Sequence, residues 1–455
     1  MKIVVLGGGP GGYVAAITAK RAGADVILIE RDELGGTCLN RGCIPTKTLI
    51  SSLELIDKIK KSKELINNST DFTINFSSLI KRKDSVVETQ RKGLSMLLKQ
   101  SGIQVIKDNG ELISPKTLFL KNSSQKITFD KIIIATGSRP ANLPFLEFDG
   151  NKILSSDDLW NLKDIPKSLL IIGAGAIGCE FAWIFHLLGS KVSITEVMPR
   201  LLPMADEDIS HTLERLFKKR KIDFHTGVMI DNLKKNNEEL EITLSSGKKI
   251  YAEKILVSVG RSYNTESLKN AEIKFGKKGE IIVDEYLETN LDGVFAVGDV
   301  NGKWLLAHVA YKEGEIAGKN IMEKKEKMVY SLVPSTIFTI SEVASVGLKE
   351  KEAIEMGIDI KKGLFPFRAI SKAHAIGEID GFVKVLADRE SDTVIGAHII
   401  GPKASELIHE LALAIGLKAK VKQLREVIHS HPTLSECIAE ALADIEKEAI
   451  HKIDN

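Results

Sequence analysis

Three things are scarce in this sequence: aromatic residues, net charge and long apolar runs. Aromatic residues make up 5% of the 455 positions, and 63 Lys and Arg residues face 61 Asp and Glu residues, which leaves a formal net charge of +2. A nearly neutral chain gives no electrostatic reason to bind nucleic acid or an anionic membrane, and few aromatic residues disfavour base stacking. No apolar run reaches the ~18–20 residues that cross a bilayer. We therefore expect no nucleic acid and no membrane as partners.

Cysteine is scarce as well, since only Cys38, Cys43, Cys179 and Cys437 occur. The segment Lys2–Leu6 already reads as a strand that enters a glycine loop, so we expect no targeting peptide and a cytoplasmic location. In a reducing compartment a close cysteine pair is more often catalytic or metal-binding than structural. A zinc site needs four ligands, and no second pair at suitable spacing accompanies Cys38 and Cys43, so we expect no metal. We interpret Cys179 and Cys437 as buried packing residues.

The length of 455 residues is too great for one hydrophobic core and predicts three or four domains. The N-terminal segment has the pattern of a dinucleotide-binding βαβ unit: a strand, the glycines Gly7, Gly9 and Gly12, a helix, and a second strand that ends in Glu30. The first glycine permits a sharp turn, the second admits a pyrophosphate to backbone N–H groups, and the third allows close helix packing. The helix N-terminus favours the phosphates, and Glu30 can accept hydrogen bonds from a ribose.

The same pattern occurs a second time, with Gly173, Gly175, Gly178 and Glu196. In both copies the first glycine and the acid lie 23 residues apart (30 − 7 and 196 − 173). One G-x-G-x-x-G motif is weak evidence for dinucleotide binding, whereas two copies with the same spacing of strand, helix and acid are strong evidence for it. The sequence therefore predicts two bound dinucleotides, and two ligand-free domains of this type are the alternative.

Further segments extend this repeat. Ile132–Gly137 is a buried-strand run that ends in glycine, and Ile255–Gly260 is its weaker counterpart. The charged, helix-patterned residues 48–100 are interpreted as an insertion that forms a solvated helical pair. Gly293–Asp299 is another strand pattern that ends in Gly-Asp, where an N–H group and a carboxylate can hold a ribityl or phosphate group. An ordinary strand end has the same pattern.

The close cysteine pair has a geometric requirement. In one continuous α-helix, residues five apart are displaced by about 7.5 Å along the axis, whereas disulfide-linked Cα atoms lie less than about 7 Å apart. Cys38 and Cys43 therefore cannot bond within one regular helix, and Gly36 and Gly42 give the backbone the freedom it needs. We expect a loop or distorted helix start, with Cys43 leading into a helix whose N-terminus favours a thiolate. An accidental pair of buried thiols is the alternative.

Near the other end, His431 is followed five residues later by Glu436. A carboxylate at this spacing can fix the tautomer of an imidazole and increase its basicity, which suits a general base. A surface histidine beside a helix cap is the alternative interpretation.

Taken in order, these segments resemble the FAD-dependent pyridine nucleotide-disulfide oxidoreductase family (class I), and within it the dihydrolipoyl dehydrogenases. The likeness spans essentially the whole chain, and the segments Gly35–Lys47 and His431–Glu436 carry it most specifically. It implies an α/β fold with two Rossmann-like dinucleotide-binding domains plus a C-terminal α+β dimerisation domain. The implied domains are FAD-binding (1–147), NAD-binding (148–265), a central domain that completes the FAD site (266–333), and dimerisation (334–455).

The resemblance also implies roles for individual residues. FAD is implied to be bound by Gly7, Gly9, Gly12, Glu30, Gly137 and Asp299, and NAD by Gly173, Gly175, Gly178 and Glu196. Lys47 is implied to lie near the flavin ring, paired with Glu180, and Ala307 and Gly260 are further cofactor-binding residues. Glu196 is not replaced by arginine, which favours NAD over NADP.

The implied activity is the oxidation of protein-bound dihydrolipoamide. His431 of the partner subunit, oriented by Glu436, deprotonates the substrate thiol, which attacks Cys38 of a Cys38–Cys43 disulfide. Electrons then pass through FAD to NAD+. The implied partners are a second copy of the chain, in a homodimer, and a lipoylated acyltransferase or H-protein of a 2-oxoacid dehydrogenase or glycine cleavage complex. Arg41 departs from the family, whose members usually carry a small apolar residue there; its charge is expected to affect the thiols modestly or to point outward.

Four other functions are alternatives to the oxidation of dihydrolipoamide. A sister enzyme that reduces glutathione or trypanothione with NADPH requires arginines near 196–202, where Arg200 occurs; a mercury reductase is disfavoured because no cysteine pair ends the chain. A flavin-containing scaffold of a multienzyme complex would not need the cysteines. A transhydrogenase-like flavoprotein without disulfide chemistry is disfavoured by the intact pair.

Overall fold

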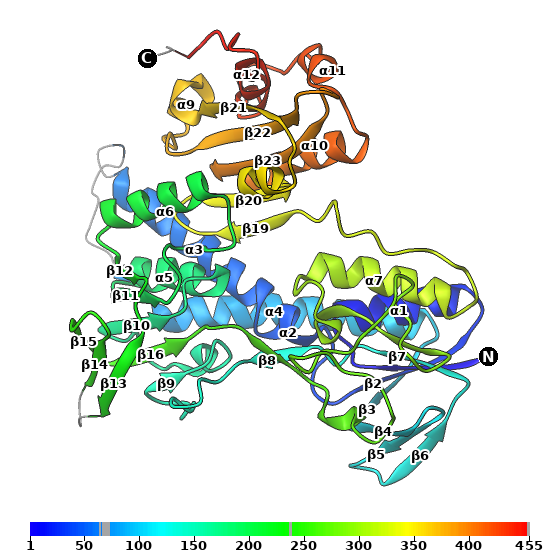
Figure 1. The fold of residues 1–455 in the computed structure, drawn as a ribbon. Helices are drawn as coiled ribbons and strands as arrows, with labels where there is room; N and C mark the ends of the chain where they lie inside the picture. The colour runs from blue at the N-terminus through cyan, green and yellow to red at the C-terminus, as the bar shows by residue number, and fades with distance from the viewer. Residues whose placement is uncertain (63–64, 66–72, 236–238, 453–455) are drawn as a thin grey trace. The chain divides into compact units, whose positions relative to one another are not determined.

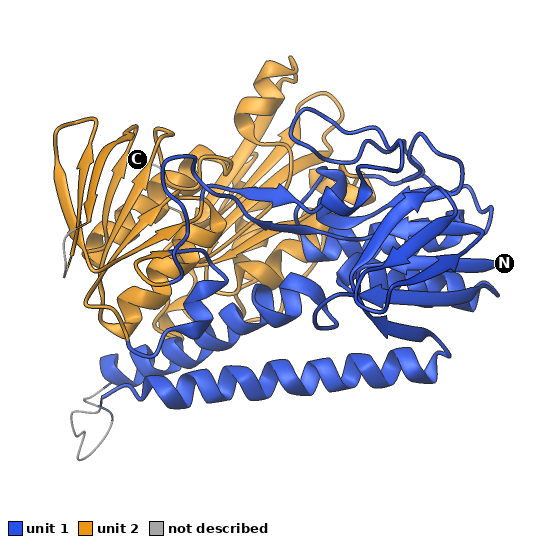
Figure 2. Cartoon of the chain, turned by 90° about the horizontal axis from the view of Figure 1, so that it is seen from below, with its two compact units in different colours: residues 1–150, 154–164, 259–329 blue, residues 151–153, 165–258, 330–455 orange. Residues whose placement is uncertain are grey.

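The chain folds into two compact units. The computed structural model describes residues 1–62, 65, 73–235 and 239–452 (Figure 1). Unit 1 comprises residues 1–150, 154–164 and 259–329, and unit 2 comprises residues 151–153, 165–258 and 330–455 (Figure 2). Each unit thus joins segments that are distant in sequence. The boundaries of the four predicted domains stay a prediction.

Unit 1 is built on a five-stranded parallel sheet with the order β18-β7-β1-β2-β3. Its strands are β1 (Lys2–Leu6), β2 (Asp25–Glu30), β3 (Gln104–Lys107), β7 (Lys131–Ile134) and β18 (Val294–Ala296). The apolar runs in β1 and β7 are buried, as is usual for parallel strands covered on both faces. β18 comes from the segment predicted to be the central domain, and it adds directly to the N-terminal sheet.

The other elements of unit 1 are mostly helices and short antiparallel strands. The helices are α1 (Pro10–Arg21), α2 (Gly36–Asn40), α3 (Cys43–Lys61), α4 (Phe76–Gln100), η2 (Asp158–Asn161), η3 (Glu266–Leu268), η4 (Gly298–Asn301) and α7 (Ala307–Asn320). The antiparallel strands are β4 (Gly110–Ser114), β5 (Thr117–Leu120) and β6 (Gln125–Thr128), with β8 (Ser138–Pro140) paired to β17 (Arg261–Tyr263). Helices α3 and α4 occupy the stretch predicted to be a helical pair.

Unit 2 repeats the first architecture. Its sheet has the order β12-β11-β10-β16-β9, with β9 (Ile153–Leu154), β10 (Ser168–Ile172), β11 (Lys191–Glu196), β12 (Asp223–Thr226) and β16 (Lys254–Val257). The helices are α5 (Ala176–Leu188) and α6 (Glu207–Lys219), and β13 (Ile230–Lys235), β14 (Leu240–Leu244) and β15 (Lys249–Ala252) form a three-stranded antiparallel sheet. The order β16-β10-β11-β12 matches β7-β1-β2-β3, so the repeat seen in the sequence is a repeat of the fold.

The C-terminal part of unit 2 is an antiparallel sheet covered by helices. Its order is β19-β20-β23-β22-β21, with β19 (Ser335–Phe338), β20 (Glu342–Gly347), β21 (Ile360–Pro366), β22 (Phe382–Asp388) and β23 (Val394–Gly401). The helices are α8 (Glu350–Glu355), η5 (Phe367–Ala369), α9 (Ser371–Ala375), α10 (Ala404–Gly416), α11 (Val421–Arg425) and α12 (Glu436–Asp444). Apolar residues of the sheet, α10 and α12 form one core. Together with the two βαβ units, this is the predicted fold class.

One buried cation links α6 to this C-terminal sheet. Lys384 of β22 is 1% exposed, and its Nζ lies 3.1 Å from Asp206, 2.7 Å from Asp208 and 2.7 Å from Glu350. Because Asp206 is the N-cap of α6, the ion cluster fixes the start of that helix. Among the described residues, no helix is both long and apolar enough to cross a membrane.

Candidate active site

The two glycine turns have nearly identical backbones. Gly9 precedes α1 with φ −73° and ψ −175°, and Gly175 precedes α5 with φ −71° and ψ −173°. Gly7 and Gly173 have φ of +106° and +99°, which side chains rarely adopt. A Cβ on Gly12 would lie 1.8 Å from the Gly7 carbonyl oxygen, and one on Gly178 would lie 2.0 Å from that of Gly173. The turns at Gly7 and Gly173 and the close approaches at Gly12 and Gly178 thus require glycine.

Each strand-end acid is held by its own turn. Glu30 accepts the Gly8 N–H at 2.6 Å and the Asp32 N–H at 2.8 Å. Glu196 accepts the Ala174 N–H at 2.6 Å and the Met198 N–H at 2.9 Å. These bonds orient both carboxylates and leave further lone pairs for the hydroxyl groups of a ribose.

Several features of these turns suit a bound dinucleotide. Neither α1 nor α5 has a side-chain cap at its N-terminus, so the first N–H groups of each helix are suited to phosphate oxygens. Gly137 follows β7 and Gly260 follows β16. Apart from their chain neighbours, none of the described residues has an atom within 4 Å of a Cβ built on either glycine. Beside the first turn, Thr136 Oγ1 is buried and has no hydrogen-bond partner in the described part of the chain. The residues present therefore fit a nucleotide-containing cofactor in each unit.

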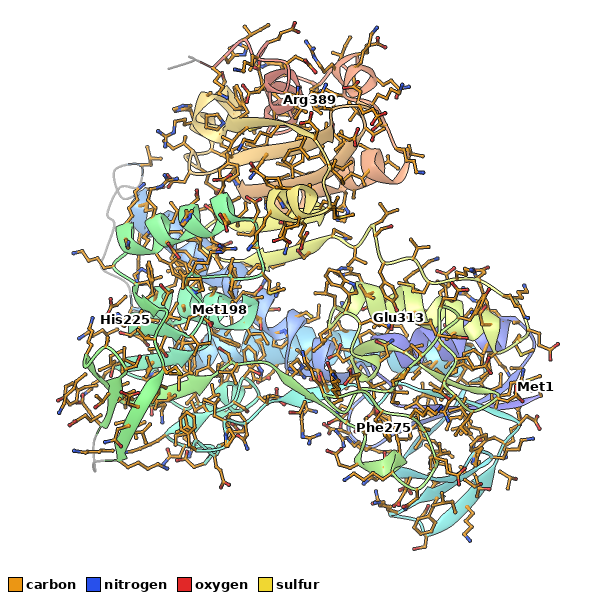
Figure 3. The ribbon with its side chains drawn as sticks, in the orientation of Figure 1. Met1, Met198, His225, Phe275, Glu313 and Arg389 are labelled. Atoms are coloured by element: carbon orange, nitrogen blue, oxygen red, sulfur yellow. The ribbon has the colours of Figure 1, made fainter. Side chains whose placement is uncertain are left out.

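Asp299 lies in a turn that a buried carboxylate supports. Glu313, on α7 and labelled in Figure 3, is fully buried, and its Oε2 accepts the Gly298 N–H at 2.6 Å and the Asn301 side-chain amide at 2.9 Å. Asp299 itself accepts a hydrogen bond from Ser138 and lies 3.7 Å from Arg261. Ala307 is the first residue of α7, in the same unit. Sequence reasoning did not find Glu313, because one acid in a helix has no local signal.

The cysteine pair occupies a break between two helices. Cys38 lies in the short helix α2, and Cys43 is the first residue of α3, which confirms that the pair does not share a regular helix. Both are present as thiols. The pKa of Cys38 is raised, first by its hydrogen bond with Cys43, then by burial and by the charge of Cys43, while Lys47 acts in the opposite direction. The two thiols thus lie close enough to share a hydrogen bond, with Cys43 at a helix N-terminus that favours negative charge.

A tyrosine pair lies near the thiols. The rings of Tyr13 and Tyr311 are 5.8 Å apart. Burial raises the pKa of Tyr311, and Tyr13 and the charges of Cys38 and Cys43 raise it further. Neither tyrosine was predicted, because both occupy ordinary helix positions. In contrast, Cys179 and Cys437 are fully buried, and burial raises the pKa of both thiols, as expected for packing residues.

The histidine–glutamate pair forms within unit 2. His431 Nδ1 lies 2.8 Å from Glu436 Oε1, and the second oxygen of Glu436 accepts the Thr433 N–H at 2.8 Å. Burial acts to raise the pKa of Glu436, but the bonds from His431 and Thr433 outweigh it and hold this pKa below its usual value. The His431 side chain is 68% exposed. An accessible imidazole with a fixed second nitrogen is suited to proton transfer.

Two other predicted residues have partners within unit 2. Glu180 is buried, and it accepts the Phe338 N–H at 3.0 Å. Its pairing with Lys47 stays a prediction. Arg200, the residue that an NADP-dependent enzyme would need, places Nη1 2.7 Å from Glu207.

Comparisons with known proteins agree with this arrangement. Residues 1–314 match the family described as pyridine nucleotide-disulphide oxidoreductase, and residues 333–442 match the dimerisation domain of the same family. The chain belongs to the pyridine nucleotide-disulphide oxidoreductase family. Members of this family bind a flavin and a pyridine nucleotide, which confirms the prediction of FAD and NAD as cofactors. The family resemblance predicted from the sequence is also confirmed.

Individual oxidoreductases of this family are similar over nearly the whole chain. Dihydrolipoyl dehydrogenase of Chlamydia muridarum is 43% identical over 443 residues, which covers 96% of this chain and 95% of that protein. Dihydrolipoyl dehydrogenase of Bacillus subtilis is 39% identical over 468 residues, which covers 99% and 98%. The crystal structure of LpdA from Mycobacterium tuberculosis superposes with a TM-score of 0.90 at 28% identity, covering 97% of this chain and 99% of that one.

Proposed function

We propose that the chain oxidises protein-bound dihydrolipoamide to lipoamide and passes the electrons to NAD+, as a dihydrolipoyl dehydrogenase. The contact between Cys38 and Cys43, at the break between α2 and α3, carries this proposal. Relatives at about 40% identity bear that enzyme name. FAD, held by the Gly7–Gly12 turn, Glu30 and the Asp299 turn, would supply the conversion of thiol electrons into a hydride.

The residues of the chain account for the thiol steps. His431 of the partner subunit, in a homodimer, takes a proton from a substrate thiol, and Glu436 stabilises the imidazolium that results. The substrate thiolate attacks the Cys38 sulfur of the Cys38–Cys43 disulfide; the S–S bond breaks, and Cys43 leaves as a thiolate at the N-terminus of α3. The second substrate thiol then passes its proton to Cys38 as its sulfur attacks the substrate sulfur of the mixed disulfide; the bond to Cys38 breaks, Cys38 leaves as a thiol, and the lipoyl disulfide is released. Two electrons remain on the cysteine pair, beside Lys47.

The second βαβ unit is proposed to bind NAD rather than NADP. Glu196 presents a carboxylate where the 2′-phosphate of NADP would be repelled. Arg200, the candidate phosphate ligand, is already paired with Glu207. These two observations argue against an NADPH-dependent glutathione reductase. Strong NADPH-driven reduction of glutathione would contradict the proposal.

Partners and location follow the same reasoning. The chain is proposed to act as a homodimer through residues 334–455, and to meet its lipoyl group on an acyltransferase or H-protein. A cytoplasmic location is proposed, because a reducing compartment suits a catalytic dithiol. Comparing free dihydrolipoamide with the lipoylated carriers as substrates identifies the complex that the enzyme serves.

Substitution of Cys38 tests the central step. Cys38→Ser is expected to abolish dihydrolipoamide oxidation while NADH oxidation by an artificial electron acceptor continues. Cys179→Ser, which changes a buried cysteine of unit 2, is the control and should retain both reactions. Full dihydrolipoamide oxidation by Cys38→Ser would refute the proposed role of the pair, and a wild-type protein without this activity would favour a scaffold.

A further inference from the structure

Arg41 lies between the two cysteines and has contacts away from both thiols. Its guanidinium contacts Asp32, in the loop after β2, and lies 4.0 Å from Asp157, which precedes η2. Its carbonyl oxygen accepts the indole N–H of Trp160 at 2.8 Å. Arg41 thus holds the turn between α2 and α3 in two ways: its guanidinium contacts two carboxylates, and its backbone carbonyl binds the Trp160 indole.

Two of these partners, Asp32 and Trp160, have further contacts. The N–H of Asp32 donates to Glu30, the acid proposed to bind a ribose. Burial raises the pKa of Asp157, although the neighbouring Arg41 acts to lower it, and its Oδ1 is buried without a hydrogen-bond partner in the described part of the chain. Lys83, itself buried, lies 5.5 Å from the centre of the Trp160 ring. The turn is therefore connected to the end of β2 through Asp32 and to a buried side chain of α4 through Trp160.

We propose that Arg41 is a positioning residue that holds the α2–α3 turn so that Cys38 and Cys43 remain opposed when their disulfide is reduced. This inference rests on the redox function proposed above. It replaces the expectation that the charge of Arg41 acts directly on the thiols. The cation that lowers the pKa of Cys38 is Lys47, and the charge of Arg41 is offset by Asp32 and Asp157.

The positioning role predicts the sign of a redox effect. A disulfide already restrains residues 38 and 43, whereas two separate thiols depend on the turn to remain together. Loosening the turn therefore gives more conformational freedom to the dithiol than to the disulfide, and it favours reduction. A direct charge effect has the opposite sign, because removing a cation disfavours the thiolate and hence the reduced form.

The experiment is a redox titration of the flavin-loaded dimer. In dithiothreitol buffers the protein disulfide and the reagent dithiol exchange to give the protein dithiol and the cyclic reagent disulfide, with two electrons and two protons transferred. Alkylation and mass spectrometry of the peptide that contains residues 38 and 43 give the fraction reduced. The proteins compared are wild type, Arg41→Val and Arg41→Lys. Arg31→Val is the control, because it removes an exposed cation from the loop after β2, which also carries Asp32.

We expect Arg41→Val to favour the dithiol about two- to tenfold, because the two ion pairs that it removes are partly exposed and each contributes little. This change corresponds to a potential about 9–30 mV less negative. Arg41→Lys should shift the same way, since an ammonium lacks the fork that reaches two carboxylates, and Arg31→Val should match wild type. An unchanged or more negative potential of the Arg41→Val disulfide would overturn the proposal. A shifted potential in Arg41→Val together with a wild-type potential in Arg41→Lys would also overturn it, because the positive charge alone would then be sufficient. A wild-type pair that never oxidises would instead refute the redox function itself, and the inference with it.

Discussion

Replacing Glu436 by Gln should slow the oxidation of dihydrolipoamide without slowing the reaction with NADH. Glu436 holds His431 through one oxygen at 2.8 Å and is itself held by the Thr433 N–H through the other at 2.8 Å. Glutamine preserves the shape and one acceptor but removes the negative charge. His431 then loses the group that fixes its tautomer and stabilises its protonated form.

The size of this effect can be estimated from the geometry. A hydrogen bond to a charged group contributes about 1.5–3 kcal/mol. Because the His431 side chain is 68% exposed, water competes for the bond and the lower figure applies, which corresponds to about a tenfold loss of rate. The pKa of Glu436 is below its ordinary value of 4.5, so this bond is present above that pKa and is lost only as the pH falls through it. The rate of dihydrolipoamide oxidation by wild type should therefore exceed that of Glu436→Gln across the neutral pH range, and the difference should disappear in acid.

The two half-reactions separate this effect from misfolding. Stopped-flow reduction of the enzyme by dihydrolipoamide should be slowed about tenfold, whereas reduction by NADH should be unchanged, since His431 acts only on the thiol substrate. Glu440→Gln is a matched control, because it removes the carboxylate that pairs with His451 at 2.6 Å one turn further along α12. A full-speed thiol half-reaction in Glu436→Gln, or equal slowing with both substrates, would refute the orienting role.

Three further substitutions test other parts of the site. Lys384→Met should lower the free energy of unfolding by about 3–5 kcal/mol, because it leaves the buried carboxylate of Asp206 without its cation; chemical denaturation measures this, and the exposed Lys362→Met should change little. Glu196→Gln should raise the KM for NAD+ about tenfold at unchanged flavin content, because the ribose loses a charged acceptor; an unchanged KM would contradict the assignment. Glu313→Gln should lower the ratio of flavin to protein after dialysis, because the turn that carries Asp299 loses a charged acceptor, and full flavin retention would contradict this.

The parts of the fold that local patterns specify could be predicted. A glycine turn, an amphipathic helix and an acid at the strand end follow from residues within about thirty positions of one another, and Glu30 and Glu196 both lie where the pattern places them. The separation of Cys38 from Cys43 into two helices followed from the rise per residue of a helix. His431 and Glu436 are also close in sequence, so their contact was predictable.

Contacts between distant residues could not be predicted in this way. Arg261 donates to Ser138, 123 positions away, and Lys384 contacts Asp206, 178 positions away. Such pairs form only after the sheets have assembled, and a lone charged residue in a strand carries no sign of its partner. The direction of Arg41 was uncertain for the same reason, since one of its carboxylate partners lies in a segment more than a hundred residues later.

The loop that follows the strand-end acid makes different contacts in the two repeated units. In the first unit, Asp32 of this loop contacts Arg41 and so connects the ribose-binding acid with the turn between the cysteines. In the second unit, Asp206 ends the corresponding loop and contacts Lys384 of the C-terminal sheet, the part of the chain that also carries His431. Because glycine turns and acids are the same in both units, these loops are where the duplicated fold acquires separate tasks. A change at Asp32 should therefore alter the thiol equilibrium but not NAD+ binding, whereas a change at Asp206 should alter stability but not the thiol equilibrium.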